Sequence, residues 1–173
     1  LHGGSGKGDD LSRLTENDGF PQYLMTGEAS LAAYALLPQL SSAHRGWEEI
    51  TDVLVSLVEA ETERLGADPA RRALSGHSMG GSGTWSLALA APDLFARAAP
   101  LSGSVRFTPE TVRALAGMSI RAYVGDADTI VSPDASVRFV EALAAQGADA
   151  SVTVFAGVDH FGVPRAAYLS EDR

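Results

Sequence analysis

One stretch constrains the fold of this chain more than any other: Ala73-Leu74-Ser75-Gly76-His77-Ser78-Met79-Gly80-Gly81. An apolar run, the pattern Gly-x-Ser-x-Gly and an alanine- and leucine-rich segment follow one another, which predicts a strand, a sharp turn and a helix. Glycines are needed at the bend because a side chain there would collide where strand and helix meet. Such a turn holds Ser78 in a strained conformation with its hydroxyl exposed, so we expect this serine to be a nucleophile.

The pentapeptide by itself is weak evidence. The chain has 18 glycines, and glycine-rich loops produce the same pattern by chance. The hypothesis gains weight from the predicted strand before the motif, the predicted helix after it, and the presence of partner residues in the required order.

Strand-like and helix-like segments alternate along the chain. Ser30–Leu37 is a continuous apolar run closed by Pro38, which predicts a strand buried on both faces. Further strands are predicted at Arg72–Ser75, Arg97–Leu101, Ser119–Val124 and Ser151–Phe155. Helices are predicted at Leu11–Thr15, Trp47–Leu65, Met79–Ala91, Pro109–Ala116 (capped by Thr108) and Pro133–Gln146, and a loop broken at Gly19 and Pro21 extends to about Met25. This alternation predicts an α/β fold with a mostly parallel sheet flanked by helices.

A serine hydroxyl becomes a good nucleophile only when a neighbouring base takes its proton and a carboxylate holds that base. His160 follows the last predicted strand, at the carboxyl end of the sheet where sites of open α/β folds assemble. His77 lies beside the serine and is expected to point away from it. Asp126 and Asp128 both follow the strand Ser119–Val124, and spacing alone does not choose between them. The order serine, acid, histidine is that of α/β-hydrolases.

The chain resembles the small carboxylesterase and predicted-peptidase group of α/β-hydrolases, which is related to dienelactone hydrolases, acyl-protein thioesterases and feruloyl or polyhydroxybutyrate-depolymerase-type esterases. The matching pieces span almost the whole chain: Leu1-His2-Gly3-Gly4, Leu37-Pro38-Gln39, Gly76-His77-Ser78-Met79-Gly80-Gly81, Gly125-x-x-Asp128-x-x-Val131 and Asp159-His160-Phe161. The resemblance implies an α/β-hydrolase fold.

The resemblance also implies roles for particular residues. The acid of the family is the aspartate three positions after the glycine, which selects Asp128 and leaves Asp126 to stabilise the loop. A developing oxyanion needs preorganised donors. One is the backbone N–H of Met79, which follows the serine at a helix N-terminus. By resemblance, the other is the N–H of Gly4.

These features predict a serine hydrolase that cleaves carboxylic esters of small to moderate size through Ser78, His160 and Asp128. The segment Ser102–Met118 leaves no room for a large cap domain, so the site should be open. Gln39, Trp47 and Phe161 are expected to contact the substrate. The alternatives are a peptidase or acyl thioesterase on the same fold, or a catalytically silent domain that binds a small ligand.

Composition excludes other classes of function. The net charge of −9 disfavours nucleic acid and anionic membrane surfaces as partners. The chain has no cysteine, which excludes disulfides, thiolate metal sites and a cysteine nucleophile. The glycine-rich loop after His2 lacks the spacing of a phosphate-binding loop. We therefore expect no metal and no cofactor.

The length of 173 residues suits a single α/β-hydrolase catalytic domain over residues 1–173. In the family, the strand before His-Gly-Gly lies between the strand equivalent to Ser30–Leu37 and the one equivalent to Arg72–Ser75. Only Leu1 of that strand is present here. We therefore expect the domain to be truncated at its N-terminus, and to lack a final helix after Leu169.

Overall fold

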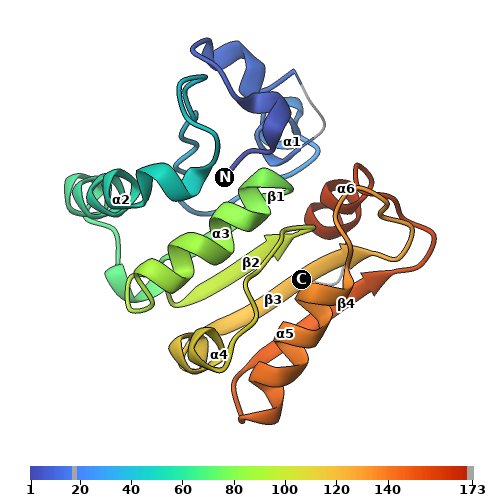
Figure 1. Ribbon diagram of the computed structural model, residues 1–173. Helices are drawn as coiled ribbons and strands as arrows, with labels where there is room; N and C mark the ends of the chain where they lie inside the picture. Colours follow the sequence, from blue (N-terminus) through green and yellow to red (C-terminus); the bar gives the residue numbers. More distant parts are fainter. Residues whose placement is uncertain (17–18, 171–173) are drawn as a thin grey trace.

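The computed structural model describes residues 1–16 and 19–170, which fold around a four-stranded sheet (Figure 1). The strands are β1 (Ala73–His77), β2 (Arg97–Leu101), β3 (Ser119–Gly125) and β4 (Ala150–Phe155). They lie in chain order, and each neighbouring pair is parallel. Parallel neighbours need crossover connections, and a helix lies between each strand and the next. The predicted α/β-hydrolase fold with a parallel sheet is confirmed.

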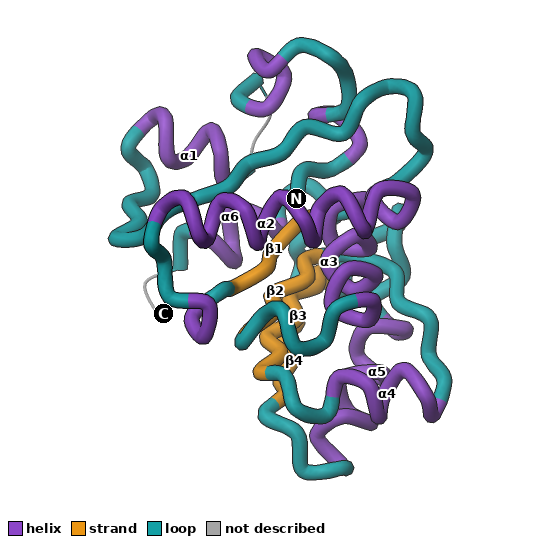
Figure 2. The backbone as a smooth tube through the Cα atoms, turned by 90° about the vertical axis from the view of Figure 1, so that its left-hand side faces the viewer, coloured by secondary structure: helices purple, strands orange, loops and turns teal. Residues whose placement is uncertain are grey.

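Helices cover both faces of the sheet. On one face lie α3 (Met79–Ala90), α4 (Pro109–Leu115) and α5 (Asp134–Ala145), while α6 (Val163–Tyr168) lies on the other, against β2 and β3 (Figure 2). The helix α2 (Thr51–Leu65) packs against α3. No helix within the described residues is long and apolar enough to cross a bilayer.

The hydrophobic core lies mainly between the sheet and the layer formed by α3, α4 and α5. Trp85 of α3 meets Phe139 of α5 edge to face, with ring centroids 5.1 Å apart. Both rings are buried together with Ile120 of β3. Burial of aromatic rings is the largest single apolar contribution that a small domain can make to its stability. This layer therefore fixes the positions of the strand ends that carry the polar side chains of the site.

The predicted strand at Ser30–Leu37 is wrong. The segment has no regular secondary structure, and Leu31, Tyr34 and Leu36 are exposed. An extended segment becomes a buried strand only when a neighbouring strand supplies hydrogen-bond partners. In the described residues, β1 pairs with β2 on one side, and on the other it meets only Leu1, whose N–H donates to Ser75 O and whose carbonyl accepts from His77 N.

The predicted loop before Met25 is also partly wrong, because it contains the helix α1 (Phe20–Thr26). Asn17 and Asp18, which belong to that predicted loop, lie outside the described residues. The other predicted helices are found. Leu11–Leu14 and Trp47–Ile50 are 3-10 turns, the second leading into α2, and two further 3-10 turns lie at Gly4–Gly6 and Pro69–Arg71.

Candidate active site

Ser78 occupies the sharp turn between β1 and α3. Its backbone has φ 58° and ψ −119°, in a region that residues other than glycine rarely adopt. A side chain at Gly76 would overlap the carbonyl of Gly80, and one at Gly80 would overlap the carbonyl of Leu1. The two glycines therefore let strand, helix and the first residue pack closely, and the turn lifts Ser78 above the end of the sheet.

His160 joins Ser78 to Asp128 through its two ring nitrogens. His160 Nε2 lies 2.8 Å from Ser78 Oγ, and His160 Nδ1 lies 2.7 Å from Asp128 Oδ2. A carboxylate can only accept, so Nδ1 carries the proton and Nε2 is free to accept one from the hydroxyl. Both His160 and Asp128 are buried, at 3% and 7% exposure. The arrangement can take a proton from Ser78 and stabilise the resulting imidazolium.

The carboxylate of Asp128 is held ionised by its surroundings. Burial alone would raise its pKa, but hydrogen bonds from Val131 N, from His160 and from Ile130 N outweigh burial and lower the pKa. Both backbone N–H groups donate to Oδ1 at 2.9 Å, which leaves Oδ2 for the imidazole. The charge that would stabilise an imidazolium is therefore present at neutral pH.

The two loops that carry Asp128 and His160 are tied to each other. Ala127 N donates to Val158 O at 3.2 Å. A side chain at Gly125, where β3 ends, would overlap the same carbonyl. Asp126 instead accepts a hydrogen bond from Gly157 N at 2.6 Å. Asp128 therefore faces His160, whereas Asp126 contributes to the contact between the two loops.

The loop His2-Gly3-Gly4 packs against the turn at Ser78. A side-chain carbon at Gly3 would lie 3.5 Å from Ser78 Cβ. His2 anchors this loop, since its Nδ1 donates to Gly3 O and its Nε2 accepts from Leu40 N at 2.9 Å. Gly4 and Met79 are the first residues of helical turns, where backbone N–H groups lack partners within the helix. Gly4 and Ser78 line the same cavity.

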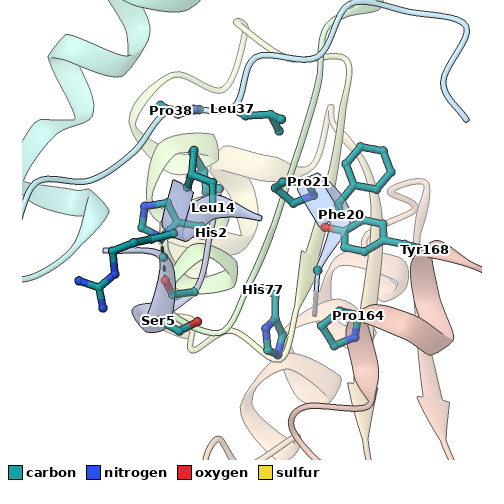
Figure 3. Close-up of a pocket in the computed structure, with 15 residues that line it drawn as sticks. His2, Ser5, Leu14, Phe20, Pro21, Leu37, Pro38, His77, Pro164 and Tyr168 are labelled. Carbon is teal, nitrogen blue, oxygen red and sulfur yellow. Dashed lines mark hydrogen bonds between the residues drawn. The ribbon is translucent and has the colours of Figure 1, made fainter. Parts of the chain in front are cut away.

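A cavity of about 320 Å3 opens beside the serine. It is lined by Gly3, Gly4, Ser5, His77, Ser78, Ile130, His160 and Phe161. Ile130 and Phe161 are largely exposed, at 59% and 67%, and form an apolar rim. A second cavity of about 90 Å3 shares Gly3, Ser5 and His77 with the first and is also lined by Phe20, Pro21, Pro164 and Tyr168 among others (Figure 3).

Of the three residues expected to contact substrate, the structure brings only Phe161 to this cavity. Gln39 donates from Nε2 to Gly6 O at 2.9 Å and to Asp10 O at 2.7 Å, so its amide stabilises a loop. Trp47 is 1% exposed and belongs to the core. Its Nε1–H donates to His2 O at 3.1 Å, and it packs closely on Gly83 of α3.

We predict that Trp47→Phe lowers the free energy of unfolding by about 2 kcal/mol, because His2 O loses a buried donor and the core loses ring volume. KM for an ester should stay unchanged. Urea unfolding and initial-rate measurements test the two parts separately. A raised KM with unchanged stability would instead indicate that Trp47 contacts the substrate.

Sequence reasoning missed three residues at the site. Ile130 lies on the cavity rim. Its position two residues after Asp128 could have suggested that it lines the site. Ser102 directly follows β2 and is buried with φ 43°. His77 contacts the backbone of His160. The last two depend on a backbone angle and on a contact between distant segments, which no local pattern reveals.

In the part of the chain that the structure describes, no group of three or more His, Asp or Glu side chains is arranged to hold a metal ion. The hydroxyl of Ser78, the imidazole of His160 and the carboxylate of Asp128 instead form one hydrogen-bonded line.

Several solved structures share the fold. A thermostable esterase aligns with a TM-score of 0.77 and 22% identity, over 99% of this chain and 51% of its own. Esterase PE8 aligns with a TM-score of 0.61 and 20% identity, over 92% of this chain and 82% of its own. The feruloyl esterase module from Clostridium thermocellum, complexed with sinapinate, aligns with a TM-score of 0.59 and 18% identity, over 92% and 69%.

The chain thus spans about half the length of the thermostable esterase. No curated protein is significantly similar to it in sequence. A family model described as "Putative esterase" matches residues 26–161, which is well over half of the chain and includes Ser78, Asp128 and His160. The resemblance drawn from the sequence motifs is confirmed, and the chain belongs to this esterase family.

Proposed function

We propose that this chain hydrolyses carboxylic esters through an acyl-enzyme formed on Ser78. The observation that carries the proposal is the hydrogen-bonded line from Ser78 Oγ through His160 to Asp128, which opens into the cavity of about 320 Å3. The line has the donor and acceptor directions of a catalytic triad, and the strained turn at Ser78 has the form of a nucleophile elbow. Membership of an esterase family supports the same conclusion.

In the first half-reaction, Ser78 Oγ forms a bond to the ester carbonyl carbon while its proton passes to His160 Nε2. The π electrons of the carbonyl move to its oxygen, which becomes an oxyanion. Asp128 stabilises the imidazolium through the bond at Nδ1. The oxyanion then collapses, the bond to the alcohol oxygen breaks, and the imidazolium proton goes to that oxygen.

The oxyanion would be stabilised by the N–H groups of Gly4 and Met79. Both begin helical turns next to Ser78, and Gly4 shares the cavity with it. Donors fixed in advance need no reorganisation as charge develops, and each typically contributes about 3 kcal/mol to transition-state stabilisation. The close packing of Gly3 against Ser78 fixes the position of this loop relative to the proposed nucleophile.

In the second half-reaction, water attacks the acyl-enzyme carbonyl while His160 Nε2 takes its proton. Collapse of the second oxyanion breaks the bond to Ser78 Oγ, and the imidazolium returns a proton to that oxygen. The products are the carboxylic acid and free Ser78. No cofactor takes part in either half.

The substrate we propose is a small-molecule ester of small to moderate size. The cavity is near the lower end of the range of about 300–1,000 Å3 that is usual for ligand sites. Between β2 and β3 the described residues hold only the short helix α4, which is too small to be a cap domain at that position. We also propose that residues 1–173 belong to a single catalytic domain.

A fluorophosphonate probe tests the proposed nucleophile. Such probes form a covalent bond only with an activated serine, because the phosphorus must be attacked by a deprotonating hydroxyl. We expect mass spectrometry of a digest to find the adduct on Ser78 and on no other serine. No adduct, with the protein folded, would instead support a domain that binds a ligand without catalysis.

Matched substrates separate the reaction classes. An ester, a thioester and an anilide with the same acyl group present the same carbonyl with different leaving groups. We expect the ester to give the highest kcat/KM. Faster cleavage of the thioester or the anilide would reassign the site to a thioesterase or a peptidase while leaving Ser78 as its nucleophile.

A further inference from the structure

His77 connects two parts of the site that the sheet itself keeps apart. It ends β1, and its Nε2 lies 2.9 Å from the backbone carbonyl of His160, which follows β4. Because the strand order is β1-β2-β3-β4, these two strands are at opposite edges of the sheet. The contact therefore spans the carboxyl end of the sheet and joins the strand before Ser78 directly to the loop of the proposed base.

The protonation state of His77 is defined by its partner. A carbonyl oxygen can only accept, so Nε2 of His77 must carry the proton. Burial, and next the nearby imidazole of His160, lower the pKa of His77 to about 4. The ring is therefore neutral at pH 7. It adds no second positive charge beside the imidazolium that would form on His160.

The ring of His77 lies close to two further groups of the site. A side-chain carbon at Gly3 would lie 3.7 Å from His77 Nδ1, and the ring centroids of His77 and His160 are 4.7 Å apart. Figure 3 shows His77 at the end of the smaller cavity nearest Pro164, and the same side chain lines the cavity beside Ser78. The ring thus fills the space between the Gly3 loop and the loop of His160.

We propose that His77 is a positioning residue for His160, acting through its Nε2–H donor rather than through contact with substrate. His160 is held at three atoms: Nδ1 by Asp128, Nε2 by Ser78, and the backbone oxygen by His77. The side-chain contacts set how the ring turns. The backbone contact holds the residue itself in place relative to Ser78 Oγ, because His77 directly precedes the serine. This inference rests on the proposed function.

Two variants separate the donor from the bulk of the ring. In His77→Gln the side-chain amide places an N–H at about the same distance from the backbone as Nε2, whereas His77→Phe keeps a ring without a donor. A misplacement of about 1 Å at a reacting group can lower a rate by about 100-fold. We expect His77→Phe to lower kcat for a p-nitrophenyl ester by about 10–100-fold with KM nearly unchanged, and His77→Gln to restore most of the loss.

A second readout needs no turnover. The proton between His160 Nδ1 and Asp128 Oδ2 should give a downfield proton resonance in the NMR spectrum. We expect this resonance to shift or broaden in His77→Phe and to return in His77→Gln. His77→Leu, which also lacks a donor but is smaller, replaces the phenylalanine variant if circular dichroism shows that the latter does not fold.

The outcomes distinguish the two proposals. Equal losses in the donor-lacking and glutamine variants, or wild-type kcat and resonance in both, would overturn the role of the Nε2–H donor. A wild-type protein that neither turns over esters nor reacts with fluorophosphonate would instead overturn the proposed function. In that case the resonance alone still decides whether His77 positions His160.

Discussion

Ser78→Ala is expected to lower kcat for p-nitrophenyl butyrate by about 10^6-fold, because it removes the oxygen that attacks the carbonyl carbon. Residual turnover should come only from the oxyanion donors acting on water. The remaining partners do not compensate, since His160 Nε2 then has no hydroxyl to deprotonate in the required position. The loss should fall on kcat rather than on KM, because Oγ contributes little to binding the ground state.

The control for this variant is Ser56→Ala, on the exposed face of α2. It removes a hydroxyl from the same chain but touches no part of the site, so its kcat should match that of the wild type. Urea unfolding of Ser78→Ala should give a midpoint close to that of the wild type, since only one half-buried hydroxyl and its hydrogen bond to His160 are lost. Turnover within tenfold of the wild type would remove Ser78 from the mechanism.

The four strands of the sheet could be predicted from the local sequence pattern, although some of their ends differ from the prediction. β2 has the predicted bounds, whereas β1 runs two residues further than predicted, to His77. Gly76 and His77 stay paired with Pro100 and Leu101 even though the motif suggests that the turn has begun. Ser30–Leu37 has the composition of a buried strand, but composition does not supply a neighbouring strand.

The missed helix α1 has a different cause. In the sequence, Gly19 and Pro21 indicate a loop rather than a helix. In the structure Gly19 is the residue before the helix, and Pro21 lies in its first turn, where its missing N–H has no intrahelical partner to lose. Proline at a helix start and proline in a loop look alike in the sequence, and only the packing of Tyr23 into the core separates them.

The proximity of Ser78, Asp128 and His160 could be predicted because the carboxyl ends of parallel strands meet at one edge of a sheet. Their catalytic roles stay a prediction. Gln39 and Trp47 could not be placed, because a polar or aromatic residue near a motif serves a loop or a core as readily as a substrate. The contact between His77 and His160 joins residues 83 positions apart, and no local signal marks it.

Asp128→Asn is expected to lower kcat by about 10^4-fold while leaving the fold intact. The asparagine oxygen can still accept from Ile130 N and Val131 N, so the loop keeps its shape. Its amide nitrogen then faces His160 Nδ1 and donates a hydrogen bond to it. The imidazole must shift its proton to Nε2, which faces Ser78 and can no longer take the hydroxyl proton.

Asp126→Asn is the matched control, because it makes the same chemical change two residues away. The Asp126 side chain accepts from Gly157 N on the exposed side of the loop, and an asparagine oxygen can accept the same bond. We therefore expect kcat within about twofold of the wild type, as for surface changes that keep their contacts. If Asp126→Asn were the variant with the large loss and Asp128→Asn the neutral one, the carboxylate that supports His160 during turnover would be Asp126, and the loop would have to rearrange to bring it there.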